Sequence, residues 1–92
     1  MVGSMTIKAF SIYTERKDAA CNMARFYAMS INRDLFGRTL LSRQWGRIGT
    51  RGQTMVLHFA EESAAVRCFL MLLRNKRARG YRPVRVQTGT SK

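Results

Sequence analysis

The side chains with the most chemistry to offer in this sequence are its cations. Seventeen Lys and Arg residues face only five Asp and Glu, so that 92 residues carry a formal net charge of +12. Thirteen of the seventeen are arginines, whose planar guanidinium groups bind phosphates and base edges through paired hydrogen bonds. This excess of positive charge predicts a polyanionic partner. A GC-rich genome would explain the preference for Arg over Lys equally well, but it would not explain the net charge.

Groups suited to catalysis or metal binding are few and scattered. The chain has one histidine, His58, and its two cysteines, Cys21 and Cys68, have neither CxxC nor Cys/His spacing. Its carboxylates are Glu15, Asp18, Asp34, Glu61 and Glu62. Such a set offers little for general acid-base or nucleophilic catalysis. We therefore expect a non-enzyme with reduced thiols, no metal and no cofactor.

Length and composition predict one folded domain. Ninety-two residues suffice for a single small core, and a hydrophobic content of 46% excludes wholesale disorder. The longest strongly apolar stretch, residues 68–73, is much shorter than the roughly 18 to 20 residues of a membrane-spanning helix. No signal-peptide pattern opens the chain. We expect a cytoplasmic protein without a membrane partner.

The hydrophobic pattern predicts an α+β fold. Strands are indicated at residues 5–14, 25–32, 39–48 and 53–59, with a bulge in the first and a loop over 15–24 between the first two. Turns are expected at 34–37 and 49–52. A helix is indicated over 61–79, closed by Gly80, and Pro83 confines any fifth strand at 81–86 to a sheet edge. These elements form a four-stranded antiparallel sheet, with that edge as a fifth strand if it pairs, and one long helix packed on one face.

The pairing of the last two strands decides which face carries the arginines. If Ile48 lies opposite Gln53, one face carries Arg43, Trp45, Arg47, Thr54, Val56 and His58. The other face then carries Met55, Leu57 and Phe59, and the helix is expected to cover it because buried unpaired arginines are costly. On this register Gly46 admits the helix, and Trp45 between two arginines forms an open stacking platform for nucleic acid. The alternative is that Trp45 closes a second small cluster, with the arginines extending over it.

The run Trp45-Gly46-Arg47-Ile48-Gly49-Thr50-Arg51-Gly52-Gln53 resembles the signature of the WGR domain. Further matches are Asn22-Met-Ala-Arg-Phe-Tyr27, Leu35-Phe-Gly37 and Lys76-Arg-Ala-Arg-Gly-Tyr81, as in small bacterial WGR proteins. The resemblance covers about residues 10 to 82, and it implies an antiparallel sheet with a helix on one face. We expect one WGR-like domain over residues 5–86, with frayed termini at 1–4 and 87–92.

The resemblance also implies a function. In the DNA-damage-dependent poly(ADP-ribose) polymerases the WGR domain binds DNA near a strand break and contacts neighbouring domains. By that resemblance Trp45 would stack at the nucleic acid, and Arg47 would contact nucleic acid or a partner domain. Charge and geometry add Arg43, Arg51, His58 and the arginines at the end of the helix as binding residues. No ADP-ribosylation is expected from this chain alone.

Two classes of function remain open on these grounds. The first is a non-catalytic module that binds nucleic acid largely without sequence preference, because no recognition helix is evident; DNA is favoured over RNA. The second is a protein-interaction module whose tryptophan and arginines dock an acidic partner. The cations at the end of the helix have a further, structural interpretation, since they complement its macrodipole.

Overall fold

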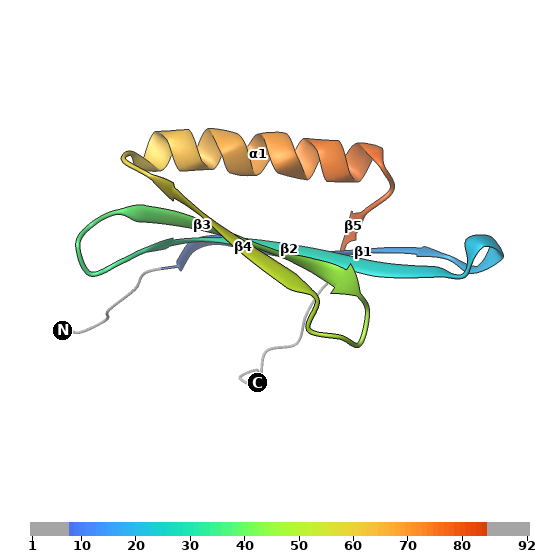
Figure 1. Cartoon of the computed structure of the whole chain (residues 1–92). Coiled ribbons are helices and arrows are strands. Elements are labelled where there is room, and N and C mark those ends of the chain that lie inside the picture. The colour runs from blue at the N-terminus through green and yellow to red at the C-terminus, as the bar shows by residue number, and fades with distance from the viewer. Residues whose placement is uncertain (1–7, 85–92) are drawn as a thin grey trace, which may run out of the picture.

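The computed structural model describes residues 8–84 and shows a five-stranded antiparallel sheet with a helix packed against one face (Figure 1). The strand order is β4-β3-β2-β1-β5. The elements are β1 (Lys8–Asp18), the 3₁₀ turn η1 (Ala19–Cys21), β2 (Met23–Arg33), β3 (Thr39–Arg47), β4 (Gln53–Phe59), α1 (Glu62–Ala78) and β5 (Arg82–Pro83). The expected α+β fold is confirmed. The fraying expected at 1–4 and 87–92 lies outside the described residues.

The first two strands form a longer hairpin than the sequence predicts. The expected loop at 15–24 is wrong, because β1 continues to Asp18 and pairs with β2 from Met23 onward. The reversal takes only a few residues, since Asp18 Oδ1 accepts a hydrogen bond from the Ala20 amide at 3.1 Å and Asn22 adopts a φ of 51°. The expected bulge near the start of β1 is confirmed by a register shift between Lys8 and Phe10.

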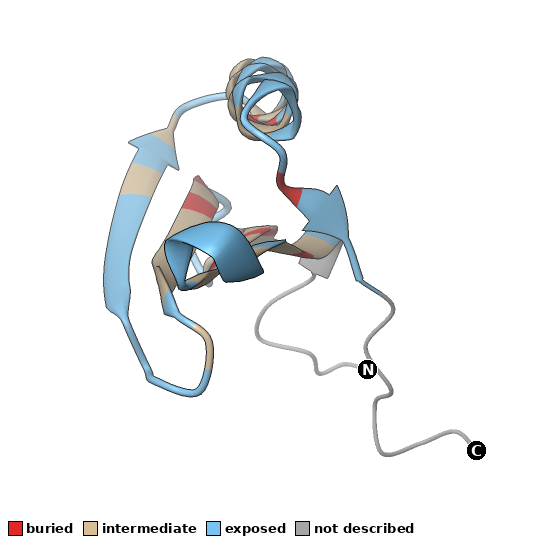
Figure 2. Ribbon diagram, turned by 90° about the vertical axis from the view of Figure 1, so that its right-hand side faces the viewer, coloured by how far each residue is buried: buried red, intermediate tan, exposed pale blue. Residues whose placement is uncertain are grey.

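The core lies between α1 and the middle strands of the sheet. Tyr27, Met29 and Ile31 of β2 and Leu41 of β3 are almost fully buried. The helix places Ala65 and Phe69 against them, and Cys68, Leu72 and Leu73 pack around that centre. In Figure 2 the buried positions lie where the helix and sheet face one another. The 3.6-residue periodicity of the sequence is therefore confirmed, as is the helix end, where Gly80 has a φ of +101°.

The predicted register between β3 and β4 is wrong by three residues. Trp45 pairs with Gln53, Arg43 pairs with Met55, and Leu41 pairs with Leu57. A shift by an odd number exchanges the two faces of a strand. The side chains of Arg43, Trp45 and Arg47 therefore lie on the face that α1 covers, together with Met55, Leu57 and Phe59. The open Arg-Trp-Arg face expected from the sequence does not exist.

The connection between β3 and β4 explains the shift. β3 pairs with β2 as far as Arg47, but with β4 only as far as Trp45. Residues 48–52 instead fold back over the sheet face opposite α1 (Figure 1), where the Ile48 amide donates to the Ala24 carbonyl at 3.0 Å. The Gln44 side-chain amide donates to the Arg51 carbonyl at 2.6 Å. The loop is thereby tied to β2 and β3.

Two glycines make this return path possible. A Cβ on Gly46 would lie 2.7 Å from Gly52 Cα. Gly46 therefore makes room for the loop, whereas the sequence analysis expected it to make room for the helix. Gly52 has a φ of +70°, and a Cβ there would overlap the Trp45 carbonyl oxygen and lie 3.1 Å from Phe26 Cζ. Phe26 is only 5% exposed although it faces away from α1. The loop therefore closes over Phe26.

A substitution at Gly52 tests this contact. Gly52→Ala combines a positive φ with a backbone overlap that no rotamer relieves, and we expect the free energy of unfolding to fall by about 3 kcal/mol or more. Gly49 has a φ of +97° but open space around it, so Gly49→Ala is expected to cost about 1 to 2 kcal/mol. Urea unfolding followed by circular dichroism measures both. Equal losses would contradict a close contact at Gly52.

Candidate nucleic-acid interface

The five residues predicted to bind nucleic acid lie on two sides of the sheet. Arg43, Trp45 and Arg47 share the α1 side. Arg51 lies in the loop that folds over the opposite face, where it is exposed. His58 is exposed on that opposite face too, paired with Leu40. The structure thus brings together three of the five and separates the other two from them.

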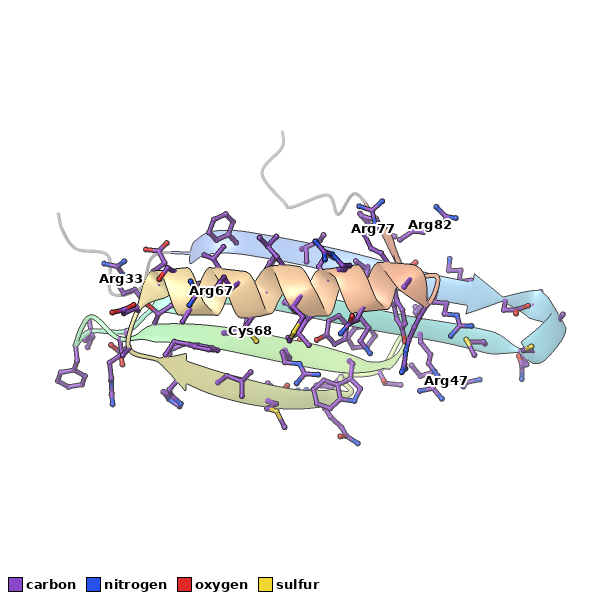
Figure 3. All side chains as sticks on the ribbon, turned by 90° about the horizontal axis from the view of Figure 1, so that it is seen from above. Arg33, Arg47, Arg67, Cys68, Arg77 and Arg82 are labelled. Carbon is purple, nitrogen blue, oxygen red and sulfur yellow. The ribbon has the colours of Figure 1, made fainter. Side chains whose placement is uncertain are left out.

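Three arginines form a row across neighbouring strands. Arg16 of β1 lies directly opposite Arg25 of β2, which in turn lies directly opposite Arg47 of β3. Paired residues share a face of the sheet, so the three side chains are on the α1 side. In Figure 3 Arg47 lies at the end of the sheet toward which the C-terminus of α1 points, and Arg16 Nε is 3.4 Å from where a Cβ on Gly80 would be. We call Arg16, Arg25 and Arg47 the arginine row.

Next to this row, Arg43 is half-buried among aromatic rings. Its Nε donates a hydrogen bond to the Tyr27 hydroxyl at 2.8 Å, and its Nη1 lies 3.7 Å from Met55 Sδ. Its guanidinium carbon is 5.3 Å from the centre of the Trp45 ring and 5.8 Å from that of Tyr27. Such cation–π contacts stabilise a positive charge that has lost part of its water.

A second cation, Lys76 of α1, shares the same tyrosine. Its Nζ lies 4.6 Å from the centre of the Tyr27 ring and 5.3 Å from that of Tyr81. Burial lowers the pKa of Lys76, and the positive charges of Arg79 and Arg43 lower it further. Burial raises the pKa of Tyr27, a change that the hydrogen bond from Arg43 opposes. We call Tyr27, Arg43, Trp45, Lys76 and Tyr81 the cation–aromatic cluster.

A cavity opens from this cluster toward solvent. It measures about 420 Å³ and is lined by Arg43, Leu72, Asn75, Lys76, Ala78 and Arg79. Three of these residues are cationic, and the Asn75 side chain can donate or accept hydrogen bonds. A group that enters this cavity meets several positive charges at once, which suits an oxyanion such as phosphate.

The carboxylates of the chain do not neutralise these cations. Within residues 8–84 the ion pairs join Lys17 with Glu15, Arg33 with Glu62, and Arg38 with Asp34. Asp18 caps η1, and Glu61 precedes α1. The carbonyls at the end of α1 are engaged by backbone amides, since Arg79 and Tyr81 both donate to the Lys76 carbonyl. The macrodipole offers only about half a charge there, so helix capping does not account for the whole set of cations.

Trp45 occupies a different position from the one predicted. It is half-buried and packs against the main core, and its ring lies beside Arg43. It joins neither an open platform nor a separate small cluster. Along β3, Trp45 lies between Arg47, which belongs to the arginine row, and Arg43.

Sequence reasoning missed Arg16, Arg25 and Lys76 as members of the site, whereas Arg79 is one of the helix-end arginines that it had proposed for binding. The loop assigned to 15–24 removed Arg16 from the sheet. Arg25 stood at the start of the predicted second strand, but its pairing with Arg16 and Arg47 was not foreseen. The position of Lys76 could have been recognised from the sequence, because it lies four residues after Leu72 and so on the apolar face of the helix. A lysine at such a position indicates an interior or interfacial cation.

Other functional groups are sparse in the part of the chain that the structure describes. Residues 8–84 contain no group of three or more His, Cys, Asp and Glu side chains placed to hold a metal ion. Cys21 is exposed and Cys68 is half-buried, and both are free thiols. No helix among the described residues is long and apolar enough to cross a membrane.

Comparison with known proteins identifies the family of the chain. The chain is similar to the uncharacterized protein y4dW of Sinorhizobium fredii (strain NBRC 101917 / NGR234), with 60% identity over 79 residues. The similarity covers 86% of this chain but only 39% of that relative, so the chain spans about two fifths of the length of the curated relative that it matches. A family model described as the WGR domain matches residues 10–88, a range that includes β2 to β5, α1 and the Trp45-Gly46-Arg47 motif. The chain therefore belongs to the WGR domain family.

Proposed function

We propose that this WGR domain is a non-catalytic, cytoplasmic module that binds the phosphate backbone of nucleic acid through the arginine row and the cation–aromatic cluster. The arginine row is the observation that carries the proposal. Like charges directly opposite one another on a sheet destabilise it, and here three arginines lie in line while the ion pairs of residues 8–84 involve other cations. A polyanion removes that repulsion and releases its own counterions.

The composition of the surface favours contact with phosphates over reading of bases. Its charged members are Arg16, Arg25, Arg47, Arg43, Lys76 and Arg79. The nearby amide side chains that could pair with a base edge are Asn75 in the cavity and Gln53 opposite Trp45. We therefore propose binding that is largely independent of sequence. DNA is favoured over RNA because the WGR domains that this chain resembles bind DNA.

Within this interface the residues act differently. The arginine row and Lys76 supply charge to successive phosphates. Trp45 holds the Arg43 guanidinium in place, and the exposed part of its ring can contact a sugar or base. Arg51 and His58 lie on the other face of the sheet, so they take no part in this contact.

A separate surface supports the alternative function, docking of an acidic protein. A depression of about 390 Å³ on α1 is lined by Leu70, Leu73, Arg74 and Arg77. Leu70 is 54% exposed, and apolar contacts bordered by arginines are typical of protein-binding hot spots. Competition separates the two functions: unrelated nucleic acids compete freely for a backbone-binding surface, whereas they compete poorly when a folded acidic protein is the ligand.

Substitutions in the arginine row test the proposed interface. For duplex DNA, Arg25→Gln and Arg47→Gln are each expected to weaken binding and to flatten the slope of log K against log salt by about 0.9 per lost phosphate contact. Fluorescence anisotropy at several salt concentrations gives the slopes. The matched control is Arg67→Gln, which removes the same charge from an exposed position of α1. An unchanged slope in both row variants, or an equal change in the control, would contradict the assignment.

The lysine of the cluster is expected to serve binding at the expense of stability. Lys76→Met keeps the aliphatic stem but removes a charge that burial, Arg79 and Arg43 disfavour. The variant is therefore expected to melt at or above the wild-type temperature and to bind duplex DNA more weakly. A Lys76→Met variant that both unfolds earlier and binds normally would contradict the proposal.

The pH dependence of unfolding reports the same lysine. Its native pKa lies below 10.5, so the folded state binds fewer protons there, and wild-type stability is expected to rise as the pH increases from that native pKa toward 10.5. The raised pKa of Tyr27 gives the opposite slope near pH 10.0, because the unfolded tyrosine ionises more readily than the folded one. Both proteins carry Tyr27, so the difference between their pH profiles reports Lys76. Urea unfolding of Lys76→Met is expected to lack this rise. The same rise in the variant would assign it to another group.

A further inference from the structure

The two edges of the sheet are built very differently. On one side, β5 (Arg82–Pro83) pairs with Thr14 and Glu15 of β1, and proline cannot donate a hydrogen bond to a further strand. The rest of that side is the edge of β1, which carries a register shift after Lys8 and the charges of residues 15–18. The β4 edge is seven residues long, pairs only with β3 among the described residues, and has no register shift. Most of β4 is exposed along its length, as Figure 2 shows in pale blue. The β1–β5 side therefore carries a proline, charges and a bulge, whereas the β4 edge is open and regular.

The β4 edge also lacks the usual protection against pairing. Its sequence, Gln53-Thr-Met-Val-Leu-His-Phe59, contains no Pro, Lys, Arg, Asp or Glu in a chain that carries 17 Lys and Arg. Met55 is 45% exposed and Val56 is 42% exposed. Natural proteins protect open edges with charges, prolines or bulges, so an edge without any of them is suited to pair with another strand.

We propose that β4 is a self-association edge, at which two copies of this chain pair antiparallel about Val56 and join their sheets into one. Val56 is the middle residue of β4. Pairing centred there places Val56 opposite its own copy, Met55 opposite Leu57, and Thr54 opposite His58. Over residues 54–58 apolar residues thus meet apolar ones and polar residues meet polar ones, and only at the two ends does Gln53 lie opposite Phe59. This self-complementarity is what selects a second copy over an unrelated strand.

The symmetry of this pairing is consistent with a closed dimer. Each pair joins residues of the same parity, so both copies turn the same face of the sheet to the same side. A two-fold axis perpendicular to the sheet relates them, and both α1 helices lie on one side. Each copy uses its open edge once, which leaves the two β1–β5 sides at the ends of the joined sheet.

The charge of the chain gives this association a distinctive salt dependence. Two copies that each carry +12 repel one another, and salt screens that repulsion. Dimerisation is therefore expected to strengthen with added salt, whereas binding of nucleic acid weakens. The inference depends only on the strand edge and goes beyond the proposed function, so either can fail without the other.

Sedimentation equilibrium of the 92-residue chain without nucleic acid, at low and high salt, tests the proposal. We expect a monomer–dimer equilibrium that shifts toward dimer at high salt. Val56→Lys puts like charges opposite each other at the axis and is expected to weaken the dimer by about tenfold or more. The control is Met71→Lys, which adds the same charge at a 55% exposed position of α1 and leaves the dimer intact.

A cross-link locates the axis independently of stability. In a Cys21→Ser background, which removes the exposed thiol, Val56→Cys is expected to form an intermolecular disulfide under oxidation, because directly opposite residues lie within disulfide range. Met71→Cys serves as the control and is expected to remain uncrosslinked. A monomer at every concentration and salt, assembly beyond the dimer, or no effect of Val56→Lys would overturn the proposal.

Discussion

The backbone of the β3–β4 loop packs against β3 where Gly52 meets Gly46, and the positions of the functional side chains depend on that contact. Because residues 48–52 fold back over Phe26, β4 begins its pairing at Trp45, three residues from the register of a tight hairpin. That register places the odd-numbered residues of β3 on the same face as the apolar residues Met55, Leu57 and Phe59 of β4. Gly46 therefore acts at the far face of the sheet, although its neighbours in the motif lie on the α1 side.

The resulting surface concentrates charge in a way that costs the fold stability. The arginine row places like charges opposite one another, and Lys76 and Arg43 approach one tyrosine from two elements. Cation–π contacts and the capped end of α1 offset part of this repulsion. The rest of the stability that offsets this repulsion comes from the core around Met29, Leu41 and Phe69. A domain of this size has little stability to spare, so a cluster of this kind is explained better by what it binds than by what it stabilises.

The helix and strands could be predicted wherever the local sequence pattern determines them. The arrangement of side chains in the candidate site could not. The helix over 61–79, the bounds of β4 and the role of Gly80 follow from periodicity and backbone preference, and all agree with the structure. The register of β3 and β4 depends on a loop packing that no local pattern displays, and so the side of the sheet that carries Arg43 and Arg47 was mispredicted. Arg16 was lost for a similar reason, since its polar neighbours resemble a loop until β2 pairs with them.

Trp45 is the residue at which the requirements of folding and binding meet. Trp45 packs against the core and its ring lies beside the Arg43 guanidinium, while Arg47 of the arginine row is two residues further along β3. Loss of the ring would therefore loosen the core and release Arg43 at the same time. A defect in binding caused at this position does not by itself identify a stacking contact with nucleic acid. Arg25 and Arg47 are more informative positions, because they are exposed and their removal relieves a repulsion within the fold. In the proposed interface the cations contact phosphate, and Trp45 holds one of them, Arg43, in place.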